Sequence, residues 1–138
     1  MNIKTLEGKK AGILKELEGL GDMRTGTVSI RYQRCGKSPC ACDDPKHQGH
    51  GPIYSYSTAV NGKTKIKNFK LGPELAKLQK ELETYQKFKQ LSKDLISISN
   101  RISELRPVQE IKDGQDLEAL KKKLEHLFRK KSKKKLTR

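Results

Sequence analysis

The densest group of candidate metal ligands in this sequence lies between residues 35 and 50. Within these sixteen residues fall Cys35, Cys40, Cys42, His47 and His50. Structural Zn²⁺ sites use four tetrahedral ligands, and three thiolates with one imidazole are a standard set. We therefore predict a structural zinc site formed by Cys35, Cys40, Cys42 and His50. His47 remains an alternative fourth ligand, and His50 is preferred because it directly precedes a rigid Gly-Pro pair.

Other chemistries are less well supported at these residues. Free cysteines prefer buried apolar positions, whereas this segment is rich in Gly, Pro and Asp. A redox dithiol lacks its C-x-x-C pair, and iron–sulfur clusters normally take four cysteines. A catalytic zinc needs an open coordination position and a general base, and the nearby Asp43 and Asp44 are more typical of turns. The rest of the sequence has no phosphate loop or nucleophile elbow, so we predict a binding protein and not an enzyme.

Three short motifs follow one another in this part of the chain. A CGK-x2-C-x-C run begins at Cys35, an HGP-x-Tyr run begins at His50, and a Gly-Lys pair begins at Gly62. Their order over residues 24–105 resembles a family of short, basic, uncharacterised prokaryotic proteins with the signature CGK-x2-C-x-C, HGPYY and a Gly-Lys hairpin. The resemblance implies a helical C-terminal region and genes often located near transposases, and it favours His50 over His47. The chain departs from the signature at Ile53, where an aromatic residue is usual.

Hydrophobic periodicity predicts an α+β fold. Residues 1–23 are predicted to form a helix, because Ile3, Leu6, Ile13, Leu17 and Leu20 recur at helical spacing. Residues 24–72 should form a three-stranded antiparallel meander that carries the Cys₃His zinc knuckle, with strands over 25–34, 53–60 and 63–71. The Asn61-Gly62 pair between the last two strands is typical of a type I′ hairpin turn.

The C-terminal half is predicted to be helical. A long amphipathic helix should cover residues 73–106, a second helix 115–128, and residues 129–138 should form a basic, disordered tail. A helix of about 30 residues is roughly 45 Å long, more than a domain of this size can cover. Its apolar stripe must therefore pack on another helix. The candidates are the N-terminal helix, in a coiled-coil-like helical hairpin, the C-terminal helix, or a second copy in a homodimer.

Positive charge is concentrated in two zones of the chain. Of the net charge of +15, residues 24–72 carry +7 and residues 121–138 carry +9, while the other segments are close to neutral. Clustered positive charge is typical of proteins that bind polyanions. We predict a nucleic acid as partner, with DNA favoured over RNA. The predicted contact residues are Arg31, Arg34, Lys37, Lys63, Lys65, Lys67, Lys121, Lys122, Lys123, Arg129, Lys130, Lys131, Lys133, Lys134 and Lys135.

The three hairpin lysines alternate with other residues, so we expect them to form a row on one face of the sheet. Val28, Ile30 and Tyr32 are expected to point to the other face, toward the helices. The alternative to nucleic-acid binding is a protein–protein adaptor that acts through its long helix.

Composition narrows the class of protein further. Only 33% of residues are hydrophobic, which predicts a thin core that needs a metal or a helix–helix contact for support. Residues 1–20 do not resemble a signal peptide, and no apolar run approaches the roughly 18 residues of a membrane span. An odd number of cysteines is unusual for a secreted disulfide framework. We expect no membrane association and a cytoplasmic location, on the nucleoid if the partner is DNA.

Overall fold

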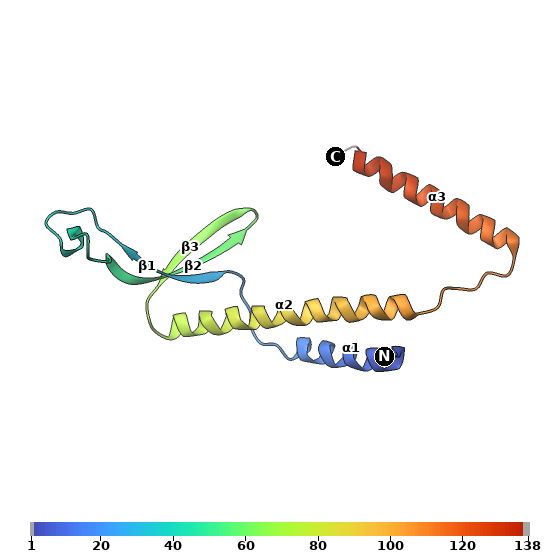
Figure 1. Cartoon of the computed structure of the whole chain (residues 1–138), viewed down its shortest axis with the longest axis horizontal. Helices are drawn as coiled ribbons and strands as arrows, with labels where there is room; N and C mark the ends of the chain where they lie inside the picture. Colours follow the sequence, from blue (N-terminus) through green and yellow to red (C-terminus); the bar gives the residue numbers. More distant parts are fainter. Residues whose placement is uncertain (1, 137–138) are drawn as a thin grey trace. The chain divides into compact units, whose positions relative to one another are not determined.

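Three α-helices and one three-stranded antiparallel sheet account for the regular structure of residues 2–136, which the computed structural model describes. The elements in chain order are α1 (Ile3–Glu18), β1 (Thr27–Gln33), the short 3₁₀ helix η1 (Ala41–Asp43), β2 (His50–Val60), β3 (Lys63–Phe69), α2 (Pro73–Leu105) and α3 (Gly114–Leu136) (Figure 1). The chain divides into two compact units, Met1–Ser103 and Glu104–Arg138. The α+β class is confirmed.

The sheet has the order β1-β2-β3, as the meander prediction requires. Asn61 and Gly62 have φ values of 53° and 77°, the positive values that a type I′ turn needs at both central positions. This turn pairs Val60 with Lys63 and so sets the register of the whole hairpin. β2 begins at His50, three residues before its predicted start, because a bulge lets it continue pairing with β1.

The hydrophobic core lies between the sheet and the first half of α2. Tyr56 of β2 packs with Leu78 and Leu82 of α2, and all three are buried. The partly buried residues around them are Val28, Phe69 and Leu75. The sheet therefore rests on α2 through one face.

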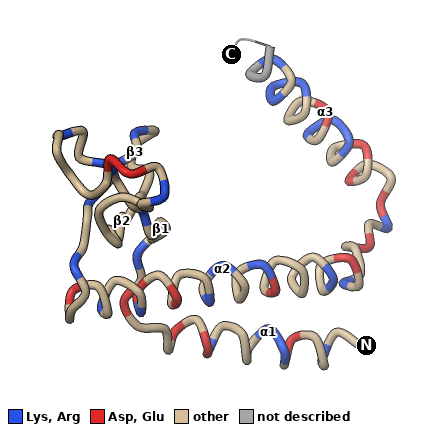
Figure 2. Tube along the Cα trace, turned by 60° about the vertical axis from the view of Figure 1, so that its left-hand side comes forward, with Lys and Arg blue, Asp and Glu red and all other residues tan. Residues whose placement is uncertain are grey.

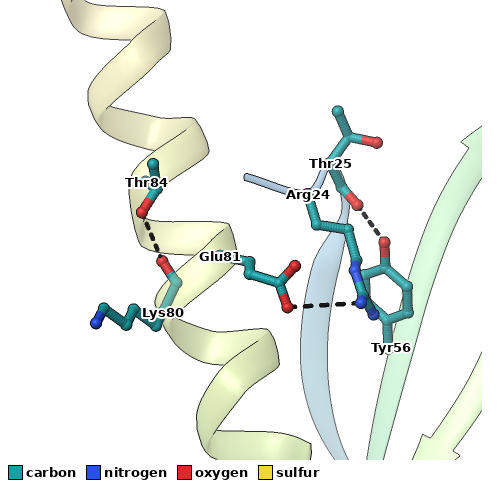
Figure 3. Close-up of polar contacts among 6 residues, drawn as sticks. All are labelled: Arg24, Thr25, Tyr56, Lys80, Glu81 and Thr84. Carbon is teal, nitrogen blue, oxygen red and sulfur yellow. Dashed lines mark hydrogen bonds and ion pairs between the residues drawn. The ribbon is translucent and has the colours of Figure 1, made fainter. Parts of the chain in front are cut away.

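An ion pair between a half-exposed arginine and a buried glutamate fixes the segment between α1 and β1 against α2 (Figure 3). The Arg24 guanidinium lies 3.5 Å from the carboxylate of Glu81, a residue only 8% exposed. The Arg24 backbone N–H also donates to the Glu81 carbonyl oxygen at 3.2 Å. The Tyr56 hydroxyl donates to the Thr25 carbonyl, whereas the bond from Thr84 to Lys80 is internal to α2. These contacts join three elements at one point.

The N-terminal helix α1 lies beside the second half of α2, as Figures 1 and 2 both show. Asn2 caps it, because the side-chain oxygen of Asn2 accepts the Thr5 backbone N–H at 2.8 Å, and it ends before Gly19. The residues of this segment that are buried or partly buried recur at the predicted helical spacing. They are Ile3, Leu6, Lys10, Ile13, Leu17 and Leu20. A coiled-coil geometry between the two helices stays a prediction.

The strand register corrects the predicted faces of the sheet. Residues directly opposite one another in antiparallel strands share a face. Tyr56 lies opposite Val28 on one side and Lys67 on the other, and Thr58 lies opposite Lys65. The lysine row of Lys63, Lys65 and Lys67 is therefore on the face that packs on α2, together with Val28 and Ile30 and not opposite them. Arg31 pairs with Ile53 and belongs to the other face.

The prediction was wrong because alternation within a strand does not say how two strands are phased. The two-residue turn decides the phase, since it places Val60 opposite Lys63. Every second pair along the hairpin then joins a residue of β3 to a residue of β2 on the α2 side of the sheet. These pairs are Lys63 with Val60, Lys65 with Thr58, Lys67 with Tyr56 and Phe69 with Tyr54.

The C-terminal helix is longer than predicted. Instead of ending at residue 128 before a disordered tail, α3 continues to Leu136, so residues 129–136 are helical. Residues 137–138 of the predicted tail lie outside the described residues. Lysine and arginine are good helix formers, and Arg129 pairs with Glu125 one turn earlier at 2.6 Å. None of the helices in residues 2–136 has an apolar stretch long enough to cross a membrane.

Candidate metal centre

The four predicted ligands converge at one end of the sheet. The sulfur atoms of Cys35, Cys40 and Cys42 and a ring nitrogen of His50 all lie within 4.8 Å of one another. The Cys42 Sγ is 3.5 Å from both other sulfurs, and the Cys40 Sγ is 3.1 Å from the His50 Nε2. The cluster therefore joins the loop after β1, the 3₁₀ helix η1 and the first residue of β2.

The spacing of these atoms fits tetrahedral coordination. Zinc–sulfur bonds of about 2.3 Å imply sulfur–sulfur edges of about 3.8 Å in a regular tetrahedron. The observed 3.5 Å separations are close to that edge. They are far longer than the roughly 2.05 Å of a disulfide, and all three cysteines are free. Three thiolates and one imidazole would fill four positions around a zinc ion, which is typical of a closed structural site.

Local turns bring the cysteines together. The Asp43 carboxylate accepts the Cys40 backbone N–H at 3.2 Å, and the Asp43 N–H donates to the Cys40 carbonyl at 3.0 Å. Asp44 Oδ1 accepts the Lys46 N–H at 3.0 Å. Both acids therefore shape the backbone around η1, and Cys42, only 1% exposed, is buried within this turn.

A β-bulge places His50 beside the cysteines. Gln33 pairs with His50 whereas Arg31 pairs with Ile53, so β2 contains one extra residue between these pairs. Gly51 occupies the bulge with φ of 146°, and a Cβ there would lie 2.8 Å from the Arg31 carbonyl oxygen. Only glycine fits this position. The bulge therefore explains why a glycine follows His50.

His47 has a different role from His50. Its Nδ1 accepts the Gly49 backbone N–H at 2.9 Å, and its ring centroid lies 6.2 Å from that of His50. The structure brings His50, and not His47, into the group of four.

Arg34 holds the cysteine segment together through backbone carbonyls. Its guanidinium donates to the carbonyl oxygens of Cys42, of Asp44 at 3.1 Å and of His47 at 2.6 Å. We predicted Arg34 as a nucleic-acid contact, but its donors are directed into this loop. Sequence reasoning missed the role because backbone carbonyls have no signature that marks them as partners of a particular side chain.

The cysteines differ in their acidity. The Cys35 backbone N–H lowers the pKa of Cys42 to about 7, against the effect of burial and with help from side-chain hydrogen bonds of the other ligands. The backbone N–H of Cys42 lowers the pKa of Cys40, but hydrogen bonding with the Cys35 and Cys42 thiols, burial and the Cys35 charge together raise it above its ordinary value. Cys42 is therefore more readily converted than Cys40 to the thiolate that binds metal.

The predicted nucleic-acid contacts fall on both units of the chain. In the first unit, Lys37 is exposed in the cysteine segment, and the lysine row and Arg31 are exposed on the sheet. In the second unit, basic residues follow one another along α3 (Figure 2). Those with exposed side chains are Lys121, Lys122, Lys123, Arg129, Lys130, Lys131 and Lys133. Lys134 and Lys135 belong to α3, but their side chains lie outside the described part.

One family model matches residues 3–80 of the chain. The chain belongs to this family, Domain of unknown function (DUF6788). The DUF6788 match contains α1, the whole sheet, the four ligands and the start of α2. Membership of an uncharacterised family is thus confirmed, whereas its signature and gene neighbourhood stay predictions. No curated protein and no solved structure matches the chain.

Proposed function

We propose that this DUF6788 chain is a zinc-stabilised nucleic-acid-binding protein, with DNA favoured over RNA. The observation that carries the proposal is the concentration of positive charge on two exposed elements. Residues 24–72 carry +7 and residues 121–138 carry +9, while the remaining residues are nearly neutral. Solubility alone does not require such segregation, whereas clustered positive charge is typical of proteins that bind polyanions.

The metal would serve the fold and not a reaction. Cys35, Cys40, Cys42 and His50 would hold a zinc ion, whose bonds to four protein ligands supply cross-links between the loop after β1, η1 and β2. The neighbouring carboxylates of Asp43 and Asp44 accept backbone N–H groups and so are engaged in turns. We propose an accessory role without catalysis, in the cytoplasm or on the nucleoid, and beside mobile elements as the motif resemblance suggests.

The charge would bind phosphates. The lysine row projects from the β2–β3 hairpin, and a second basic surface runs along α3. Each neutralised phosphate of a duplex lowers the slope of log affinity against log salt concentration by about 0.9. Binding by several of these residues therefore predicts a steep loss of affinity with salt.

The test is a fluorescence anisotropy titration of a labelled duplex at about 50 mM and about 200 mM salt. With six phosphate contacts, affinity should fall about a thousandfold or more between the two conditions. Equal affinities, or no binding at either salt, would contradict the proposal. A chain truncated after residue 120 should lose most of its affinity.

The apolar stripe of α3 favours a second candidate, a protein–protein adaptor. Leu117, Leu120, Leu124 and Leu127 repeat at coiled-coil spacing and are between 38% and 45% exposed. The sequence pointed to the long helix α2 for an adaptor role, and the leucine stripe of α3 offers a further surface of the same kind. A partner helix or a second copy of the chain would cover it.

Two variants of α3 distinguish the nucleic-acid binder from the adaptor. Both introduce Gln, which keeps the helix propensity of α3 high. Replacing Leu120 and Leu124 with Gln removes the stripe and keeps the charge, whereas replacing Lys130 and Lys131 with Gln removes charge and keeps the stripe. An adaptor or α3 homodimer loses its partner only in the leucine variant, as light scattering after gel filtration would show. A nucleic-acid binder loses affinity only in the lysine variant.

A further inference from the structure

The outer edge of β1 is an unprotected edge of the sheet. β1 is the first strand in the order β1-β2-β3, so no strand within residues 2–136 pairs with this edge. The backbone N–H and C=O groups that point outward from an edge strand are free to pair with another strand. β1 contains no proline and one charged residue, Arg31, and all its residues except Val28 are exposed. It therefore lacks the features with which sheets usually prevent added pairing.

The opposite edge of the sheet is different. β3 carries Lys63, Lys65 and Lys67 at every second position. Lysines on an edge strand disfavour edge-to-edge pairing, because an added strand would crowd their charges. Of the two edges, only that of β1 is therefore suited to accept a further strand.

An apolar groove of about 420 Å³ lies between β1 and the start of α2. Most of its lining residues are apolar: Val28, Ile30, Tyr54, Leu71, Leu75 and Ala76. Among them Ile30 is 62% exposed and Leu71 is 74% exposed. Exposed apolar groups that gather at one place mark an interaction surface. A strand added to β1 would carry every second side chain on the side of the sheet where this groove lies.

The sequence of β1 itself fits this surface. Val28 lies opposite Tyr56, which packs on α2, and Ile30 lies opposite Tyr54, so both are on the α2 side of the sheet. Alternation places Tyr32, which is 43% exposed, on the same side. β1 thus has only apolar and aromatic side chains on the side of the groove. The residues on its other side are all polar: Thr27, Ser29, Arg31 and Gln33.

We propose that β1 pairs antiparallel with β1 of a second copy of the chain, around a two-fold axis at Ile30. Ile30 is the middle residue of Thr27–Gln33, so this register pairs the two strands over their whole length. Val28 then lies opposite Tyr32 of the other copy, and Ile30 lies opposite its own equivalent. Such pairs of β-branched and aromatic residues stabilise antiparallel strands.

Charge and symmetry favour a second copy as the occupant. The one charged residue of β1, Arg31, lies opposite Ser29 in this register, so no two like charges face each other. A strand of another protein would cover one exposed β1 edge, whereas a second copy covers both edges at once. The combined sheet would end in β3 on either side, where the lysines disfavour further addition. The two-fold pair is therefore closed.

The test measures the mass of the zinc-loaded full chain in solution by sedimentation equilibrium. About 0.3 M salt screens the repulsion between two chains of net charge +15. Under these conditions the chain should have twice the mass of one copy at about 200 µM and should dissociate on dilution. The variant with Leu120 and Leu124 replaced by Gln should behave identically, because the contact does not involve the leucine stripe of α3.

A matched pair of variants locates the contact. Ile30→Lys places two lysines opposite each other on the two-fold axis and should weaken dimerisation at least about tenfold. The control, Ile66→Lys, makes the same change in charge at a residue that is 63% exposed but lies on β3. It should dimerise like the unaltered chain. Circular dichroism checks that both variants are folded.

Hydrogen–deuterium exchange tests the contact in the unaltered chain. Between about 1 µM and about 200 µM, the outward-pointing amides of residues 28–32 should become protected, since they gain hydrogen bonds only in the dimer. Residues 63–69 should exchange alike at both concentrations, because β3 stays at the edge of the sheet.

Four results would overturn the inference. A chain that is monomeric at every concentration leaves β1 free for a strand of another protein. A dimer that is lost in the leucine variant is held by α3 instead. Equal dimerisation of Ile30→Lys and Ile66→Lys places the contact away from β1. If Ile30→Lys does not fold, exchange at residues 28–32 that is independent of concentration has the same meaning. The measurements involve no nucleic acid, so their outcome is independent of the proposed function.

Discussion

Removal of the metal should disorder residues 34–50 and leave the hydrophobic core folded. In this segment only Cys42 and Gly49 are buried, so it has almost no apolar contacts of its own. The core around Tyr56, Leu78 and Leu82 contains no residue of the segment. The two regions therefore depend on different interactions.

The free energies involved indicate that loss of the metal affects residues 34–50 alone. Ordering the backbone costs at least about 1 kcal/mol per residue, or about 17 kcal/mol for residues 34–50. Zinc binding to small structural sites contributes about 10–16 kcal/mol. The three hydrogen bonds of Arg34 add about 1 kcal/mol each. The zinc value already includes the cost of ordering the site, so the metal keeps the segment ordered, whereas the bonds of Arg34 alone are far too weak to do so.

Hydrogen–deuterium exchange with mass spectrometry, before and after treatment with a chelator, measures this directly. Elemental analysis should first give about one zinc per chain. After chelation, amides of residues 34–50 should exchange within seconds, while those of residues 54–57 and 78–82 keep their protection. Retained protection in residues 34–50 would refute the structural role of the metal. Loss of protection everywhere would refute the independence of the core.

Three further predictions concern single residues. His50→Gln should lose the bound zinc, whereas His47→Gln should retain about one equivalent by elemental analysis; the reverse result would exchange their roles. Arg34→Lys keeps the charge but loses the forked donor geometry, so the zinc affinity should be about tenfold weaker. Competition with a chromogenic chelator measures this affinity. An unchanged affinity would contradict the role of the guanidinium in holding the loop carbonyls. Gly51→Ala should lower the free energy of unfolding by about 2 kcal/mol in urea denaturation, because its Cβ would meet a backbone carbonyl. The control is Gly12→Ala, at a position within α1 where a Cβ would meet open space. This substitution should raise the free energy of unfolding by about 0.5–1 kcal/mol. If both substitutions destabilise the protein, the clash at residue 51 is not the cause.

Much of the local structure follows from the sequence alone. The three- and four-residue spacing in residues 3–20 predicts α1, and Pro73 marks the first residue of α2. Asn61-Gly62 predicts the hairpin turn, because few other pairs tolerate two positive φ values. The cluster of four candidate ligands is also predictable, since all four lie within sixteen residues and turns of this length can bring them together.

The end of α3 does not follow from composition. A run of basic residues is compatible both with a disordered tail and with a helix, because lysine combines a high helix propensity with charge repulsion between neighbours. Helical pairs such as Glu125 with Arg129 favour the helix.

Only the tertiary structure decided which groups face one another. The phase of the hairpin placed Lys65 on the α2 side of the sheet, opposite the alternation-based expectation. The fold likewise directed the Arg34 guanidinium into the cysteine segment and buried Glu81 beside Arg24. The physical reason is the separation along the chain of the residues that interact. Spacing between near neighbours determines helices, turns and a compact ligand set. Register and packing between distant elements determine the partner of each side chain. The four candidate metal ligands belong to the first class, and the ion pair of Arg24 with Glu81 belongs to the second.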